Sequence, residues 1–361
     1  MSQQRDFPKA VLYSWPSSVW SIVPQLCLYE KGYSEDEYII KYVDISNPSY
    51  LKINIHGTIP TLVVPILETT GIDVDTKYRS LKDTVSICDF LDQARSAHSS
   101  NTSSNKPAPT LGSATIDAKV TSDAIIDLIH LPAVDPNFIA IAALNAQELK
   151  EKASQRPGKS LSARREALQK YITEARESVS QPSVTAKEGS LTYNQKIIQF
   201  LEEKLKVNEE VWEIYNGTAG QEKEEQFYQV SNKAWSENLP GVLEKLEEMI
   251  EGPFTMGDQL SLADLHAISW LARIISIAGG KPVADGIDAI STKTGKPIEP
   301  KLKKFWESWL ERESFQKVLV PACVAFAEMN SMNLKKRREP FVPIDQLWFP
   351  IDQLLPNDGA P

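Results

Sequence analysis

Asp83 and Thr84 form an acid–hydroxyl pair at the start of a predicted helix, directly after a short predicted strand at residues 78–81. Apolar residues recur after the pair at helical spacing: Val85, Ile87, Cys88 and Leu91. A helix start presents unpaired backbone N–H groups and a partial positive charge. The pair could therefore cap its own helix, or it could help to hold a charged group of a ligand. Capping is the simpler interpretation for either residue alone.

Pro60 is the second residue whose position suggests a site. It stands between two β-branched residues, Ile59 and Thr61, directly before the apolar run at residues 62–64. Proline cannot donate a hydrogen bond to a β-ladder, so it is confined to the first residue of a strand, an edge strand or a bulge. The Ile59–Pro60 bond is therefore a candidate cis peptide bond.

A strand-opening proline, followed by an acid–hydroxyl pair at a strand-to-helix turn, resembles the glutathione-binding domain of the glutathione transferase superfamily. The resemblance implies a thioredoxin-like fold and glutathione as cosubstrate. It implies that the backbone of Ile59, the residue before Pro60, pairs with the cysteinyl part of glutathione. It also implies that Asp83 and Thr84 hold the γ-glutamyl end.

In this superfamily the turn after the first strand carries the residue that activates the thiol. A hydroxyl that donates to the sulfur at a helix start favours the thiolate. Ser18 matches the catalytic serine of theta- and zeta-like classes and is the predicted catalytic residue. Three neighbours, Ser14, Ser17 and Ser21, are close enough in sequence to be alternatives. Any of the four could instead serve the turn or cap the helix.

Two groups that the resemblance leads one to expect are missing. Thr58 stands where the superfamily often has Lys or Gln near the glycyl carboxylate, and residues 22–25 lack the basic residues common in the first helix of several classes. His56 could take over the carboxylate, although a single histidine in a loop is more often an ordinary surface residue. These differences leave open a second hypothesis, a non-catalytic or weakly glutathione-binding regulatory protein on the same fold.

Composition restricts the class of protein. The 361 residues are enough for two domains, and 42% hydrophobic with 24% charged residues is typical of globular proteins. A net charge of −9 argues against nucleic-acid or anionic-membrane partners. Cys27, Cys88 and Cys323 are odd in number and widely spaced, which indicates free thiols. With no predicted membrane span or signal segment, we expect a cytoplasmic protein, and no metal site is predicted.

The N-terminal part, residues 1–96, follows the thioredoxin-like order. Predicted strands at 10–13 and 38–45 flank a helix that runs to Gly32, and a hairpin and the closing helix follow. Pro24 falls within the first helical pattern. It fits the first turn if the helix begins near Ser21, and otherwise it should kink the helix.

Residues 97–115 are rich in Ser, Asn and Pro, and we interpret them as a flexible linker. The following domain, residues 116–335, is predicted to be almost wholly helical. Its predicted helices span 116–130, 137–152, 162–178, 193–215, 221–251 with a kink at Pro240, and 304–318.

Ser261 and Asp264 have the spacing of a capping box at the start of a long apolar helix. The order Gly-Asp-x-x-Ser-x-Ala-Asp at residues 257–264 is similar to the buried helix start of the transferase helical domain. The resemblance implies a structural role, so neither residue is a predicted catalytic group.

The region 116–220 is longer than in a typical transferase, with an insertion at about 137–220. This architecture, and the Leu-Tyr-x-Trp turn at residues 12–15, resemble the branch of ganglioside-induced differentiation-associated proteins. The tail, 336–361, repeats Pro-Ile-Asp-Gln-Leu at 343–347 and 350–354. It could pack over the helical domain or line the mouth of a substrate pocket.

The sequence thus predicts a thioredoxin-like α/β domain followed by an enlarged all-α domain. The resemblance implies a glutathione transferase whose thiolate attacks a small apolar electrophile between the two domains, as in detoxification. It also implies that the chain could form a homodimer.

Overall fold

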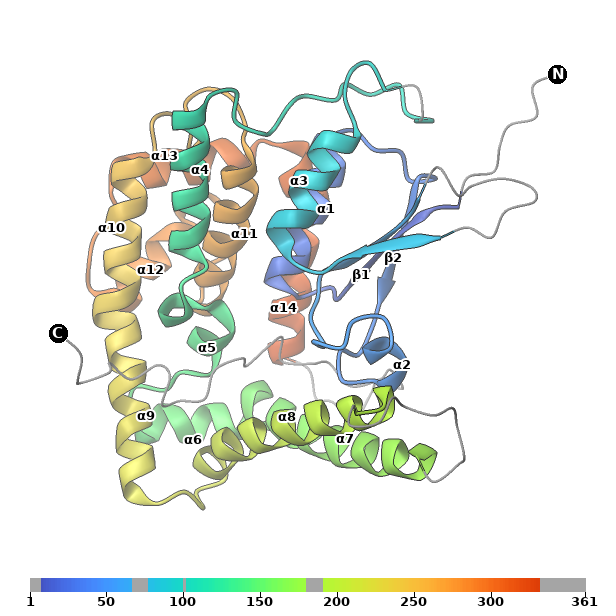
Figure 1. The fold of residues 1–361 in the computed structure, drawn as a ribbon. Helices are drawn as coiled ribbons and strands as arrows, with labels where there is room; N and C mark the ends of the chain where they lie inside the picture. Colours follow the sequence, from blue (N-terminus) through green and yellow to red (C-terminus); the bar gives the residue numbers. More distant parts are fainter. Residues whose placement is uncertain (1–7, 67–76, 100–101, 180–190, 332–361) are drawn as a thin grey trace.

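The computed structural model describes residues 8–66, 77–99, 102–179 and 191–331 (Figure 1). Its N-terminal domain contains one four-stranded sheet with the order β2-β1-β3-β4. The strands are β1 (Ala10–Ser14), β2 (Tyr38–Tyr42), β3 (Thr61–Pro65) and β4 (Tyr78–Leu81). β2 runs parallel to β1, whereas β3 is antiparallel to both β1 and β4. The predicted thioredoxin-like domain is confirmed.

Three helices belong to this domain: α1 (Val19–Glu30), α2 (Pro48–Leu51) and α3 (Thr84–Ala94). α1 and α3 lie on the side of the sheet that faces the helical domain (Figure 1). α1 begins at Val19, so Pro24 lies inside the helix and not in its first turn. The alternative in which the helix begins near Ser21 is therefore wrong. β2 ends at Tyr42, three residues before the predicted end at residue 45, because the Asp44 carboxylate accepts from the backbone N–H of Ser46 and forms a turn (2.9 Å).

The segment between the domains is tied to a buried ion pair. Lys31 Nζ lies 2.8 Å from Asp92 Oδ1 and donates to the carbonyl of Pro109 (2.6 Å). The Asp92 carboxylate accepts from the backbone N–H groups of Leu111 (2.8 Å) and Gly112 (2.9 Å). The described part of the predicted linker therefore has neither helix nor strand, yet its second half is fixed to the N-terminal domain.

The second domain is helical, as predicted. Its elements are α4 (Ile116–Ile129), η2 (Pro132–Val134), α5 (Pro136–Ile141), α6 (Ala146–Ser154), α7 (Arg156–Val179), α8 (Tyr193–Tyr215), α9 (Gln221–Lys233), η3 (Ala234–Asn238), α10 (Leu239–Met249), α11 (Leu262–Ile277), η4 (Ala284–Ile287), α12 (Asp288–Thr294), α13 (Pro300–Leu310), η5 (Phe315–Leu319) and α14 (Val320–Ser331).

Three predicted helices differ from the observed ones. The predicted helix 304–318 is wrong as a single helix, because α13 ends at Leu310 and residues 311–312 form a turn before the π-helical segment η5. The region 137–152 forms two short helices, because the Asn145 side chain caps a new helix at Glu148 N (3.0 Å). The predicted helix 221–251 is continuous except for a π-helical segment, η3, immediately before Pro240. Pro240 has no backbone N–H to donate to the preceding turn, and a π-helical segment can accommodate such a residue. The helix is therefore irregular at Pro240, where the sequence predicted a kink.

α11 is the central helix, and it is buried from Leu262 to Ile275. The predicted capping box is confirmed at its start. The Asp264 carboxylate accepts from the backbone N–H groups of Ser261 (2.7 Å) and Thr255 (2.6 Å) and from the Ser261 hydroxyl (2.6 Å). These donors satisfy a carboxylate whose pKa burial raises to about 6.

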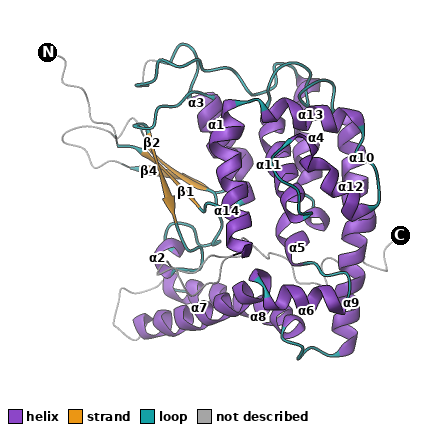
Figure 2. Ribbon diagram, turned by 180° about the vertical axis from the view of Figure 1, so that it is seen from behind, coloured by secondary structure: helices purple, strands orange, loops and turns teal. Residues whose placement is uncertain are grey.

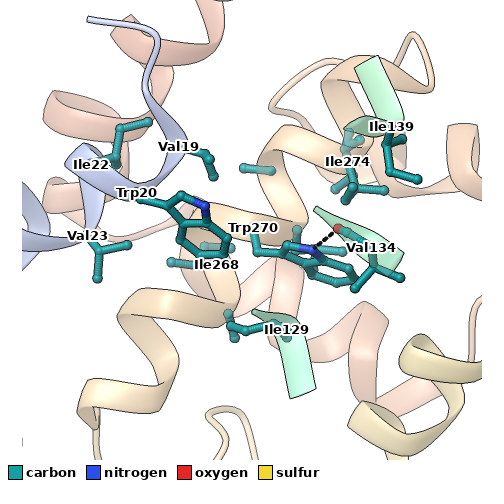
Figure 3. Packing of buried hydrophobic residues seen from close by; sticks show 14 of the residues in the cluster. Val19, Trp20, Ile22, Val23, Ile129, Val134, Ile139, Ile268, Trp270 and Ile274 are labelled. Carbon is teal, nitrogen blue, oxygen red and sulfur yellow. Dashed lines mark hydrogen bonds between the residues drawn. The ribbon is translucent and has the colours of Figure 1, made fainter. Parts of the chain in front are cut away.

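The two domains share one apolar core. Trp20 of α1 and Trp270 of α11 are both buried in it, and the indole N–H of Trp270 donates to the carbonyl of Val134 (3.1 Å), as Figure 3 shows. This shared core holds the two domains together, because the removal of apolar surface from water is the main stabilising contribution to folding.

The inserted helices α7 and α8 run side by side beneath α2, across the base of the molecule (Figure 2). Their apolar faces form a separate cluster with α2: Leu51, Leu168, Ile172, Ala175, Ile197 and Leu201. Two tyrosine hydroxyls of the insertion also donate hydrogen bonds to the first domain. The Tyr193 hydroxyl donates to the carbonyl of Leu51 (2.6 Å), and the Tyr171 hydroxyl donates to Asp44 Oδ2 (2.8 Å). The insertion therefore packs against the thioredoxin-like domain as well as extending the helical one.

The three cysteines are free and buried, as expected. In the described parts of the chain, no helix combines the length and the apolar character needed to cross a bilayer. The predicted hairpin loop after residue 66 and the repeated tail after residue 335 lie outside the described residues.

Candidate functional site

The sheet topology brings the three predicted site segments to one end of the domain. In the β1–β3 pair, Tyr13 lies opposite Thr61, so the turn after β1 lies beside the residues that precede β3. In the β3–β4 pair, Leu62 lies opposite Leu81, so the start of α3 is at the same end. The serine turn, the proline and the acid–hydroxyl pair thus share one edge, because antiparallel neighbours place the end of one strand beside the start of the next.

The Ile59–Pro60 bond is cis, as the sequence suggested. A buried polar network supports it. The Asn54 amide donates to both the carbonyl (3.0 Å) and the hydroxyl (2.8 Å) of Thr58, and the Tyr50 hydroxyl donates to the same carbonyl. Thr58, which replaces the expected Lys or Gln, is therefore engaged in holding the turn.

The four candidate serines are all buried, but their surroundings differ. Ser18 caps α1, and its Oγ accepts from the Ser21 backbone N–H at a long distance of 3.4 Å. Ser14 Oγ accepts from the Gln25 side chain (3.1 Å). Ser21 Oγ has no hydrogen-bond partner among the described residues. Ser17 differs from the others because it lines a cavity between the domains.

Asp83 caps α3, since its Oδ1 accepts from the Ser86 backbone N–H (2.8 Å). Its carboxylate is exposed, while Thr84 is buried. His56 is also exposed, in the loop before β3. The structure therefore confirms the capping role of Asp83, and a role of any of these residues toward glutathione stays a prediction.

The cavity has a volume of about 210 Å³ and is enclosed by elements of both domains. Ser17 comes from the turn before α1, and the other walls come from α5, α6, the first turn of α7, α11 and α14. Part of the lining is apolar, with Ile141, Ile277 and Phe326. This composition is typical of a small-molecule site, in which apolar walls surround a few polar groups.

Arg273 is the residue that connects the cavity to the serine turn. Its Nη2 donates to the carbonyl of Ser17 (2.5 Å), and its guanidinium lies 4.0 Å from the centre of the Phe326 ring. The sequence analysis missed this residue. The available signal was a single arginine inside a helix that is otherwise apolar on nearly all sides, since buried charges are rare without a specific reason.

No group of three or more His, Cys, Asp or Glu side chains with metal-binding geometry occurs within the described ranges. The polar groups that line the cavity include serine hydroxyls, three cationic side chains and the start of α7.

Residues 12–99 match the glutathione S-transferase N-terminal domain, and residues 208–313 match the glutathione S-transferase C-terminal domain. Together the two matches cover more than half of the chain. With the cis-proline domain and the capping box described above, they show that the chain belongs to the glutathione S-transferase superfamily. The residues between the matches, 100–207, include α7 and most of α8.

Several solved transferases are similar over most of their length. Glutathione transferase Omega 3C from Trametes versicolor is 16% identical, with 89% of this chain and 91% of that chain covered and a TM-score of 0.42. Omega 1C from the same organism is 14% identical, with 90% and 97% covered and a TM-score of 0.47. A bacterial zeta-class transferase, maleyl pyruvate isomerase, is 13% identical, with 87% and 97% covered and a TM-score of 0.45. A comparison with curated proteins found no match. The resemblance to the ganglioside-induced differentiation-associated branch stays a prediction.

Proposed function

We propose that the protein is a glutathione transferase, in which a glutathione thiolate at the start of α1 attacks an electrophile seated in the cavity between the domains. The observation that carries this proposal is the place of Ser17. It belongs to the turn that precedes α1, and it also lines a cavity whose other walls come from the helical domain. A thiolate beside this turn would face whatever occupies the cavity.

Glutathione itself would lie along the edge formed by the cis-proline turn and the start of α3. The backbone of Ile59 beside Pro60 would pair with the cysteinyl part, and Asp83 and Thr84 would hold the γ-glutamyl end. The exposed carboxylate of Asp83 supports this assignment, because it can accept from an ammonium group while its Oδ1 caps the helix. His56 remains a candidate for the glycyl carboxylate.

The protein would contribute by stabilising the thiolate. A serine hydroxyl that donates to the sulfur, together with the positive end of α1, lowers the thiol pKa, and each unit corresponds to about 1.36 kcal/mol. The sulfur then bonds to the electrophilic carbon. The displaced electron pair leaves with the departing group or moves into an adjoining carbonyl, and the thiol proton passes to solvent. No protein side chain becomes covalently attached.

The electrophile would place an apolar body against Ile141, Ile277 and Phe326. The free state of all three cysteines supports a reducing compartment, and we propose a cytosolic location on that ground. A homodimer is also part of the proposal, and sedimentation velocity would test it against the chain mass of 40.3 kDa.

Alanine substitution of each serine tests the site. Since Ser17 lines the cavity, Ser17→Ala should lower kcat/KM with 1-chloro-2,4-dinitrobenzene about 10- to 100-fold and raise the thiol pKa of bound glutathione. Ser18→Ala should remove mainly a helix cap and cost about 1 kcal/mol of folding stability.

A larger loss of kcat/KM in Ser18→Ala than in Ser17→Ala would instead assign the thiol-stabilising role to Ser18. Unchanged rates in both variants would contradict a serine mechanism at this turn. Retention on immobilised glutathione without turnover by the wild type would favour the non-catalytic hypothesis.

A further inference from the structure

Three cationic side chains from three elements line the cavity: Lys152 of α6, Arg156 of α7 and Arg273 of α11. No acidic side chain occurs among the described residues that line it. Glu148 lies 3.5 Å from Lys152 Nζ, at the edge of this group. The cavity wall therefore carries a concentration of positive charge.

The cationic groups are held in place by contacts with the protein. Arg273 is buried, with its guanidinium fixed between the Ser17 carbonyl and the Phe326 ring. Arg156 lies over the same ring, 5.3 Å from its centre. Lys152 donates to the carbonyl of Ala142, and burial lowers the pKa of its ammonium group. Prearranged cations of this kind bind an anion without having to be ordered first.

Asn137 adds a buried amide to the cavity wall. Its side chain is 5% exposed and lines the cavity. Burial raises the pKa of the neighbouring Asp135 carboxyl group to about 6, and a hydrogen bond from the Asn137 side chain partly offsets this effect. The amide is therefore engaged with the N-cap of α5, and the case for an anion depends on the cationic side chains.

The start of α7 adds to the same field. Arg156, Pro157 and Ser160, which are among its first five residues, all line the cavity. The N-terminus of this 24-residue helix carries a partial positive charge and backbone donors, which favour an anionic oxygen nearby.

We propose that the cavity takes an amphipathic carboxylate, whose anionic group lies between Arg156 and Arg273 while its apolar body contacts Ile141 and Ile277. The inference rests on the proposed function, because it names the class of electrophile for the same site: a small acid with an apolar body, in place of a wholly apolar compound.

Calorimetric binding of two unreactive probes tests the inference in the full-length protein without glutathione. The probes, 4-phenylbutanoate and 4-phenylbutan-1-ol, share a skeleton and differ in charge. We expect the acid to bind at least about ten-fold more tightly than the alcohol, because charge-assisted hydrogen bonds are stronger than neutral ones. Arg156→Gln should weaken binding of the acid about ten-fold and leave the alcohol unchanged.

Arg165→Gln is the matched control, because Arg165 lies on the same helix, pairs with Glu209 and does not line the cavity. This variant should retain the preference for the acid. Circular dichroism would confirm that each variant is folded.

Equal affinity for the acid and the alcohol would overturn the inference, as would an equal loss in Arg156→Gln and Arg165→Gln. Displacement of the acid by saturating S-methylglutathione would also overturn it, since the cations would then serve the carboxylates of the tripeptide. The proposed function fails separately: acid binding without glutathione turnover contradicts the transferase alone, whereas turnover without acid preference contradicts only the present inference.

Discussion

At the scale of single residues, the buried pair of Lys31 and Asp92 shows how one carboxylate can connect two segments. The two side chains are 1% and 7% exposed, and every described contact of the Asp92 oxygens is with Lys31 or the segment that leads to the helical domain. The carbonyl of Leu111 then accepts from the backbone N–H of Leu262, the first residue of α11. Asp92 therefore links the first domain to the start of the central helix.

Asp92→Ala should destabilise the protein by about 3–5 kcal/mol, because it leaves the Lys31 ammonium buried without its counter-charge. Urea unfolding would measure the change. Asp123→Ala is the control: Asp123 pairs with Lys119 on the surface, where the side chains are 49% and 61% exposed, and its loss should cost less than about 1 kcal/mol. Equal effects would show that the buried pair contributes no more than the exposed one.

At the scale of elements, the packing of α8 against the loop before β3 connects the insertion with the proposed glutathione site. Gly57 has φ +56°, and a β-carbon there would lie 2.6 Å from the ring of Phe200. Gly57 lies only three positions before the cis-proline, Pro60. The insertion is thus able to influence the position of the turn that Ile59 and Pro60 form.

Gly57→Ala should destabilise the protein by about 2–4 kcal/mol, from the left-handed backbone and from the overlap with Phe200. In a Phe200→Ala background the same change should cost about 1–2 kcal/mol, because the overlap with the ring is removed and only the left-handed backbone and a 3.0 Å approach to the Ile45 carbonyl oxygen remain. Gly217→Ala serves as the control, since Gly217 has φ +71° with open space around it. A cost that is independent of Phe200 would contradict the packing described here. Thermal or urea unfolding would supply all four values.

At the scale of the whole molecule, a histidine pair lies at the contact between the domains. His130 Nε2 is 3.0 Å from His266 Nδ1, and the His130 ring stacks on Trp20 of α1 with centroids 3.8 Å apart. Burial lowers the pKa of His130 to about 4 and also lowers that of His266. Both rings are neutral at physiological pH, and protonation would place charge in the shared core.

The stability contributed by a neutral His130 should be fully present above pH ~6.5 and should fall as the pH drops toward 4, because the unfolded chain then binds the proton more strongly. Burial raises the pKa of Asp135 and Asp264 to about 6, so these groups act in the opposite direction. Comparison with His130→Gln isolates the histidine. Between pH 7 and 4, the wild type should lose about 3 kcal/mol relative to this variant in urea unfolding. A constant difference across this range would contradict the assignment.

The sequence by itself determined the features that depend on a few neighbouring residues. Pro60 marked the cis bond and the start of β3, Asp83 marked the start of α3, and the pair Ser261 and Asp264 marked the start of α11. The bounds of α8, 193–215, also agree with the prediction. Caps, proline restrictions and apolar periodicity are local rules, so a single sequence is enough to apply them.

Only the tertiary structure decided where the insertion packs and which residues enclose the cavity. Apolar periodicity showed that α7 and α8 bury one face, but not that the partner would be α2. Arg273 meets Ser17 across 256 positions of the chain. Contacts of this kind follow from the way whole helices pack, which the pattern of any one segment does not specify. For that reason the cavity, with its cations, could not be predicted from the motifs that identified the fold.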